Sequence, residues 1–175
     1  MKKLIFSILI LSSFSCFGQN NEFADWTENE KSDYKKLREL AMYVHGKKRS
    51  EISKDVIFEK YIFFDYVLKD TLIDRKEKRI QSFDTLFYYF RKPIDSIGIE
   101  NLDAKPIRFY KDNEVYKPFA DQLAEIEPNV FVYFVRSKPQ SPLGTLWFDP
   151  ATNKLISWIL INQGGYRFFL TFNLM

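Results

Sequence analysis

Apolar and aromatic residues fill nearly every position in the last third of the chain, from residue 129 to residue 174. Breaks at proline, glycine and asparagine divide this part into short apolar runs, which is typical of β-strands. We predict four strands: Val130–Arg136, Gly144–Asp149, Leu155–Asn162 and Tyr166–Leu174. Their connections are short, so neighbouring strands should pair in antiparallel fashion.

The side chains of these strands divide between two faces of the predicted sheet. The first and third strands are apolar on both faces, whereas the last strand alternates, with Tyr166 and Phe168 on one face and Arg167 on the other. Charged residues are too few here to solvate a whole face, and helices can cover only one. We therefore expect the second face to curl over a cavity, to form a partial barrel or to be covered by another chain. Aromatic pairs that only stabilise the sheet are the simpler interpretation.

Ahead of the sheet, apolar positions recur every three or four residues, which predicts helices. The first helix should begin at Thr27, where Thr27 and Glu30 fit a capping box, and should end at Gly46. We predict a second helix over Ser50–Asp70. Residues 56–69 leave a strand open as the alternative, because they are rich in aromatic and β-branched side chains.

A third helix is predicted over Thr71–Phe90, with Pro93 as its stop. Prolines and a glycine exclude a long helix in the next stretch. There, Pro106–Lys111 fits an edge strand, because proline is tolerated at a sheet edge. Phe119–Ile126 fits a short helix.

This order of elements predicts an α+β fold. About three N-terminal helices should pack on a curved C-terminal antiparallel sheet of four to five strands, as one domain over residues 27–175. The layout resembles that of NTF2-like and cystatin-like proteins, in which a curved sheet wraps around helices. The resemblance is one of topology alone, carried by no motif, and fold alone would not give function.

The N-terminus has the features of a secretory signal peptide over residues 1–18. A basic start, Met1–Lys3, precedes an apolar run and then a stretch rich in small residues. The apolar run is too short for a membrane span, and we predict no span elsewhere. Cleavage after Gly18 would leave a loosely ordered leader, residues 19–26, and a periplasmic or extracellular protein. Lipidation at Cys16 is the alternative, and would give an outer-membrane lipoprotein anchored by its lipid.

Charge and cysteine content narrow the range of partners. The chain has 26 Lys and Arg against 23 Asp and Glu, and Lys2 and Lys3 would leave with the signal peptide. The nearly neutral remainder provides no field to collect nucleic acid. Cys16 is the only cysteine, so the exported chain would have no disulfide and would depend on its core for stability.

We find no catalytic motif in the sequence. One histidine and no mature cysteine exclude a Cys/His zinc site and a cysteine nucleophile, and we expect no metal and no cofactor. His45, Asp121 and Asp149 are the candidates for acid–base chemistry, although the end of a helix explains His45 equally well. The basic run Lys47–Arg49 would suit a phosphate or a lipid headgroup, although a solvated loop is the simpler interpretation.

Two functions follow as hypotheses. The first is an exported, non-enzymatic binding module that uses an aromatic, charge-poor sheet face to bind a protein partner or a second copy of itself. The alternative is a pocket between the sheet and the helices, which would bind a small molecule or serve a hydrolase- or isomerase-type reaction. The candidate binding residues are Tyr133, Arg136, Trp147, Trp158, Tyr166 and Phe168.

Overall fold

The computed structural model of the protein describes residues 23–114, 116–117 and 120–174. The predicted signal peptide and Cys16 lie outside these ranges. The chain has an α+β fold in which helices come first and antiparallel strands follow, as predicted. The helices are α1 (Glu28–Val44), α2 (Lys54–Lys60), α3 (Asp65–Lys69), α4 (Ile73–Ile97) and α5 (Ala120–Leu123). The strands are β1 (Leu102–Pro106), β2 (Val130–Val135), β3 (Pro142–Phe148), β4 (Leu155–Ser157), β5 (Leu160–Gln163) and β6 (Tyr166–Phe169).

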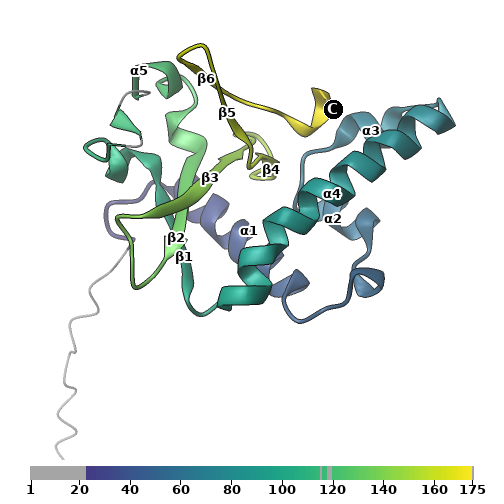
Figure 1. The fold of residues 1–175 in the computed structure, drawn as a ribbon, viewed down its shortest axis with the longest axis horizontal. Coiled ribbons are helices and arrows are strands. Elements are labelled where there is room, and N and C mark those ends of the chain that lie inside the picture. The colour runs from purple at the N-terminus through teal and green to yellow at the C-terminus, as the bar shows by residue number, and fades with distance from the viewer. Residues whose placement is uncertain (1–22, 115, 118–119, 175) are drawn as a thin grey trace, which may run out of the picture.

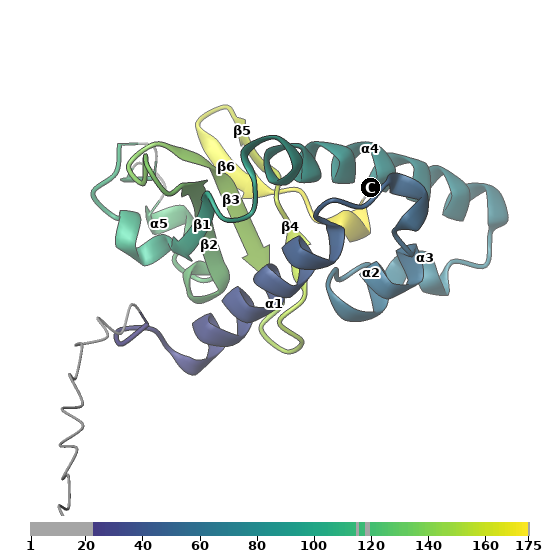
Figure 2. The ribbon, with the colours of Figure 1, turned by 90° about the horizontal axis from the view of Figure 1, so that it is seen from below.

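The strands form two sheets. The larger has four strands in the order β1-β2-β3-β4, and β5 pairs with β6 in a separate hairpin. Figure 1 and Figure 2 agree that α2, α3 and the start of α4 extend to one side of the larger sheet, whereas α5 lies at the other side. Among the described residues, no helix is both long enough and apolar enough to cross a membrane.

Helix α1 begins with the predicted capping box. The Thr27 hydroxyl accepts a hydrogen bond from the Glu30 amide at 3.1 Å, and the Glu30 carboxylate accepts one from the Thr27 amide at 2.7 Å. The fold also includes part of the predicted leader, because Trp26 is buried and its ring contacts the rings of Phe23 and Phe131. Phe23 and Trp26, which we predicted to lie in a loosely ordered leader, therefore pack against the core.

The single helix predicted over Ser50–Asp70 was wrong. The structure has two short helices, α2 and α3, separated by an extended segment. In that segment Phe63 donates a hydrogen bond to the Leu155 carbonyl at 2.9 Å, and the Leu155 amide donates to Tyr61 at 2.8 Å. Pairing with the edge of β4 thus overrides the helical pattern. The strand alternative was wrong as well, because the described segment has only an isolated β-bridge between Ile62 and Leu155.

Pro93 does not stop α4, contrary to the prediction. The helix begins at Ile73 and continues through Pro93 to Ile97. Proline removes the hydrogen bond to the Tyr89 carbonyl, but Tyr89 is exposed and water can replace that donor. The additional turn buries Ile94, and Gly98, at a φ of 91°, then ends the helix.

The edge strand lies earlier in the chain than predicted. Strand β1 occupies Leu102–Pro106, and the segment Ile107–Tyr110 is a 3-10 helix. Pro106 is therefore the last residue of the strand and not the first. Strand β1 is still an edge of the sheet, as expected, because it pairs with β2 alone.

The third predicted strand is divided into β4 and β5 at Trp158 and Ile159. The Ser157 hydroxyl causes the break, because it accepts a hydrogen bond from the Ile159 amide at 3.0 Å and donates one to the Leu170 carbonyl at 2.6 Å. The chain leaves the larger sheet there and forms the β5–β6 hairpin. Strand β6 ends at Phe169, earlier than the predicted Leu174.

A separate hydrophobic core packs against each face of the larger sheet. One core joins Phe131, Leu146 and Phe148 to α1 and α4. On the opposite face, Val130, Val132 and Phe134 are covered by parts of the same chain. That cover consists of Ile107, Tyr110, Tyr116, Leu123 and Phe169. None of the three arrangements that we expected for the second face is found among the described residues, because segments of the same chain cover it and the β5–β6 hairpin forms a separate sheet.

Candidate ligand pocket

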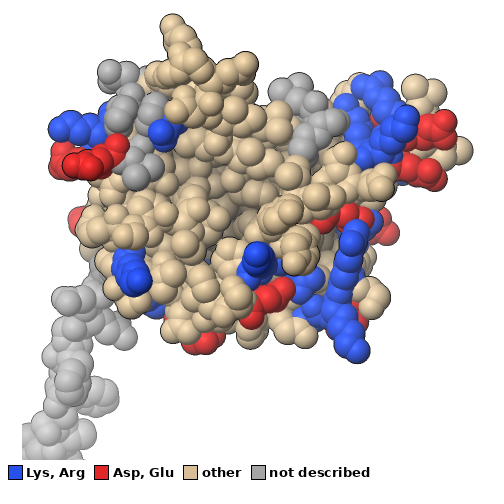
Figure 3. All heavy atoms as spheres, viewed as in Figure 1, with Lys and Arg blue, Asp and Glu red and all other residues tan. Residues whose placement is uncertain are grey.

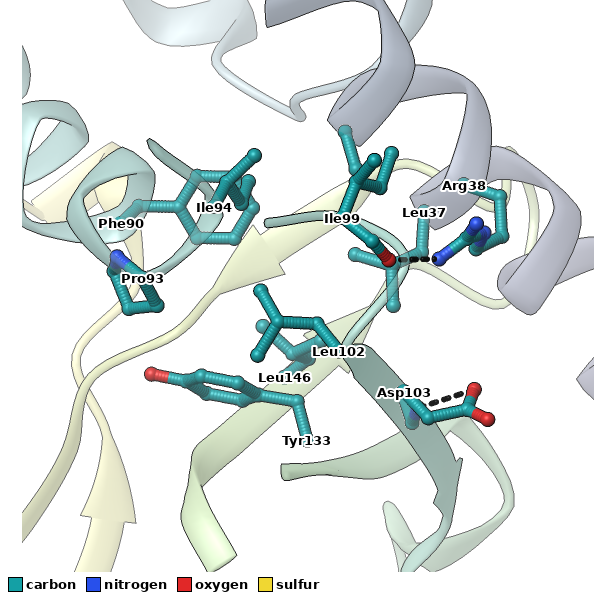
Figure 4. Close-up of a pocket in the computed structure, with 12 residues that line it drawn as sticks. Leu37, Arg38, Phe90, Pro93, Ile94, Ile99, Leu102, Asp103, Tyr133 and Leu146 are labelled. Carbon is teal, nitrogen blue, oxygen red and sulfur yellow. Dashed lines mark hydrogen bonds between the residues drawn. The ribbon is translucent and has the colours of Figure 1, made fainter. Parts of the chain in front are cut away.

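A pocket opens between the larger sheet and helices α1 and α4 (Figure 4). Its volume is about 50 Å³. Helix α1 contributes Leu37, Arg38 and Ala41, and α4 contributes Phe90, Pro93 and Ile94. The remaining wall is formed by Ile99, Leu102, Asp103, Ala104, Tyr133 and Leu146. Ten of these twelve residues are uncharged, so the pocket is an apolar site.

Small residues create the space. Ala41 on α1 and Ala104 on β1 lie at positions where a larger side chain would fill the pocket. Gly144 on β3 pairs with Tyr133 on β2, and the tyrosine ring lies directly over it. A Cβ atom added to Gly144 would lie 2.7 Å from Tyr133 Cε1, so glycine is what allows the ring to lie against the sheet.

The charged residues of the pocket lie at one end, where Figure 4 shows Arg38 and Asp103 on the side away from Pro93. The Asp103 carboxylate accepts hydrogen bonds from the Tyr34 hydroxyl at 2.8 Å and from the Ala104 amide at 2.9 Å. It also forms an ion pair with Arg136 at 3.0 Å. Arg38 donates to the Ile99 carbonyl at 3.1 Å. Asp103 is thus fully engaged in structural contacts and is poorly placed to act as a base.

Tyr133 supplies the polar group at the other end of the pocket. Its hydroxyl points toward Pro93 in Figure 4. Burial raises the pKa of Tyr133 above its ordinary value, so the hydroxyl is protonated at neutral pH. It can therefore donate a hydrogen bond to a bound group.

Trp158 supports the pocket from behind. Its ring lies 4.8 Å from the Phe90 ring and 4.3 Å from the Phe172 ring, between centroids. Phe90 is part of the pocket wall, so Trp158 holds that wall in place without lining the pocket itself.

The other predicted binding residues do not join Tyr133 in the pocket. Trp147 lies on the opposite face of the sheet, where its ring is 5.6 Å from that of Phe169. Tyr166 and Phe168 are 73% and 43% exposed on the β5–β6 hairpin. Arg136 belongs to the Asp103 cluster. The predicted residues therefore do not form one site.

Sequence reasoning missed most of the pocket residues. Leu37 and Ala41 were recognisable only as part of the apolar stripe of α1, and the stripe does not reveal that a pocket lies above it. Arg38 and Asp103 carried no signal in the sequence, because neither belongs to a motif of charged residues at a defined spacing.

The three acid–base candidates are not brought together either. His45 caps the end of α1, and Asp149 accepts hydrogen bonds from Thr152 in the β3–β4 hairpin. Asp149 lies near Asp33 at the other end of α1. Asp33 is twelve residues before His45, so Asp33 and His45 are about 18 Å apart along the helix. The side chain of Asp121 lies outside the described atoms. Among the residues that the structure describes, no three or more His, Cys, Asp or Glu are grouped to hold a metal ion.

A polar cluster lies beside α1, away from the pocket. Asp33 is completely buried, and its Oδ1 accepts a hydrogen bond from Asn153 Nδ2 at 2.8 Å. Burial raises the pKa of Asp33 to about 6, against the opposing effect of the amides of Asn153 and Asn129. Within the described chain, neither Asp33 Oδ2 nor Asn129 Nδ2 makes a hydrogen bond.

The neighbouring Glu30 behaves in the opposite way. Arg108 binds its carboxylate at 2.7 and 3.0 Å and also donates to the Asp25 carbonyl. Burial raises the pKa of Glu30, but the hydrogen bonds and the charge of Arg108 outweigh burial and leave the pKa below its ordinary value. Both acidic residues thus connect α1 to other parts of the fold.

Figure 3 shows that charged side chains are sparse over the middle of one face of the molecule, in the view of Figure 1. A hollow lies in the middle of this face, where Figure 1 places β3 and α4. Four of the twelve lining residues of the pocket lie on these two elements, Phe90, Pro93 and Ile94 on α4 and Leu146 on β3. The other eight come from α1, the segment after α4, β1 and β2.

Comparisons with protein-family models, with curated proteins and with solved structures gave no match. The resemblance to the NTF2-like and cystatin-like layouts therefore stays a prediction.

Proposed function

We propose that this protein is an exported, non-enzymatic binding module that holds a small apolar group in the pocket between its sheet and its helices. The observation that carries the proposal is the apolar lining of a pocket between the larger sheet and helices α1 and α4. Export rests on the sequence of residues 1–18.

The size of the pocket limits what it can hold. Sites for drug-sized ligands have volumes of roughly 300–1,000 Å³. A cavity of roughly 150 Å³ lined by apolar side chains holds benzene. At about 50 Å³, this pocket suits a group the size of a branched aliphatic side chain. Such a group could belong to a larger molecule that rests on the surface outside.

The chemistry of the lining favours binding over catalysis. A general base needs a free carboxylate, imidazole or amine near the substrate. Asp103 is occupied by three partners, and Tyr133 is protonated at neutral pH. The tyrosine hydroxyl can orient a ligand by donating a hydrogen bond, but its raised pKa makes it a poor base.

A pair of adjacent substitutions on α1 tests the pocket. Ala41→Leu would fill the space, whereas Met42→Leu changes a side chain that is 60% exposed. The probe is 3-methylbutan-1-ol, followed by two-dimensional NMR of the backbone amides. We expect shifts around Leu37, Ala104 and Leu146 in the wild-type protein and in Met42→Leu, and none in Ala41→Leu. Shifts that persist in a folded Ala41→Leu variant would refute the proposal.

Binding of a protein partner, or of a second copy of the chain, is the second candidate function. The exposed Tyr166 and Phe168 on β6 favour it, since large aromatic side chains are typical of interfaces. Light scattering on the mature protein would show an association that the double change of Tyr166 and Phe168 to Ser abolishes. A wild-type protein that stays monomeric at every concentration, and retains no partner, would contradict this function.

The proposed export has its own test. The mass of the protein recovered from its cell envelope would correspond to a chain that begins at Gln19, or to one that begins at a lipid-modified Cys16. A mass that includes residues 1–15 would contradict both routes.

A further inference from the structure

A second pocket lies between the loop after α1, the start of α2 and the middle of α4. Its volume is about 60 Å³, several times the roughly 10–15 Å³ that one water molecule requires. Of the basic run Lys47–Arg49, only Arg49 is part of the wall of this pocket. The side chain of Lys47 instead lies over the Tyr43 ring, 3.8 Å from the centroid.

Positive charge is in excess on the wall of this pocket. Arg49 Nη2 and Lys54 Nζ lie 2.8 and 2.6 Å from the same oxygen, Oδ2 of Asp84. One carboxylate thus holds two cations, which leaves one positive charge unbalanced. A guanidinium has five N–H donors and an ammonium has three, so both cations retain donors for a ligand.

A third cation, Arg91, completes the wall. It donates hydrogen bonds to the Val44 carbonyl at 3.3 Å and to the Lys47 carbonyl at 2.7 Å, and it forms an ion pair with Asp95 at 3.2 Å. These contacts fix the guanidinium in place against the end of α1. Its Nε atom is buried and makes no hydrogen bond within the described residues.

The rest of the wall is apolar and aromatic. Phe83 and Phe87 stack with their ring centroids 5.3 Å apart, and Ile52 lies beside them. Tyr88 lies at the rim and is largely exposed. The pocket therefore combines hydrogen-bond donors of positive charge with an aromatic surface.

We propose that this pocket binds a phosphate group attached to an organic molecule. A phosphate monoester carries nearly two negative charges and three terminal oxygens, and the phosphodiester of a phospholipid headgroup carries one charge and two terminal oxygens. Either group can accept hydrogen bonds from the cations of the wall, Arg49, Lys54 and Arg91. The exposed ring of Tyr88 at the rim then contacts the organic part. The group could belong to a soluble phosphate monoester or to a phospholipid headgroup, and the test separates the two sources.

Two substitutions remove the exposed donors, and a third serves as their control. Arg49→Gln and Lys54→Gln each delete one cation of the pocket. Lys48→Gln deletes the same charge one residue away, at an exposed side chain outside the pocket. The probes are inorganic phosphate, phenyl phosphate and vesicles of phosphatidylglycerol, with phosphatidylcholine vesicles as the neutral comparison. Calorimetry measures the soluble probes, and sedimentation measures the vesicles.

We expect phenyl phosphate to bind more tightly than inorganic phosphate. Each of Arg49→Gln and Lys54→Gln should weaken its binding about tenfold, as expected for loss of a hydrogen bond to a charged group, and Lys48→Gln by less than about twofold. Binding to phosphatidylglycerol vesicles alone, lost in Arg49→Gln and kept in Lys48→Gln, would support the site with a lipid headgroup as the source. Equal losses in all three variants would indicate general electrostatic attraction and overturn the proposal. Absence of binding to every probe would overturn it as well.

Discussion

Asp33→Asn should stabilise the protein at neutral pH, although it removes a charged residue from the centre of a polar cluster. Asp33 is completely buried, and burial raises its pKa from 3.8 to about 6. A shift of about 2 pKa units corresponds to about 3 kcal/mol between the protonated and ionised forms. The structure explains why the pKa of Asp33 is raised: its Oδ2 makes no hydrogen bond among the described residues, and the nearby cation Arg108 is engaged with Glu30.

The pH dependence follows from the direction of this shift. Between about pH 4 and pH 6 the folded protein keeps a proton on Asp33 that the unfolded chain has released. The free energy of unfolding therefore falls as the pH rises through this window, and the full penalty is present above about pH 6. Asparagine has no charge to bury. If the Asn129 amide turns to present its oxygen, the new amide nitrogen also gains an acceptor.

The assay is urea unfolding of the wild-type protein and Asp33→Asn at pH 4, 5, 6, 7 and 8, followed by tryptophan fluorescence. We expect nearly equal stabilities at pH 4 and a gain in the variant that grows to about 2–3 kcal/mol at pH 7. Asp112→Asn, at an exposed residue, is the control and should change stability by less than about 0.5 kcal/mol at every pH. The reasoning is refuted if the difference between the wild-type protein and Asp33→Asn does not change with pH.

Three further substitutions test the packing and the ion pairs by the same unfolding assay. Gly144→Ala should cost about 1–3 kcal/mol, because the new Cβ displaces the Tyr133 ring; no loss of stability would mean that the ring moves freely. Trp158→Ala should cost about 3–5 kcal/mol, whereas a cost below about 1 kcal/mol would place its side chain at the surface. Arg108→Gln should cost about 3 kcal/mol because it leaves the buried Glu30 without a cation, and a loss near zero would show that water replaces it.

The sequence predicted those elements that are set by local chemistry. The start of α1 was placed correctly because the capping box of Thr27 and Glu30 acts within one turn of the chain. Strand β2 and the hairpin after Asp149 were predicted for a similar reason, since turn residues delimit them. The α+β order followed from the change in periodicity between the two parts of the chain.

Elements that depend on distant partners could not be predicted in this way. The break in Ser50–Asp70 arises from hydrogen bonds to Leu155, which is about a hundred residues away. Helix α4 passes Pro93 because the next turn buries Ile94 against the sheet. The ligand pocket depends on which small residues face one another after folding, and periodicity does not contain that information.

The second face of the larger sheet shows that an apolar pattern predicts burial of a face but not the segment that buries it. Two apolar faces on β2 require a cover on each side, and the structure has both covers. The pattern does not state what the second cover is. That choice depends on Ser157, whose hydroxyl takes the place of backbone partners and redirects the chain into the β5–β6 hairpin. Because the hairpin buries Phe169 against the sheet, the exposed aromatic surface is reduced from a whole face to the outer side of β6. Within the described residues, both faces of the larger sheet are therefore covered by parts of the same chain.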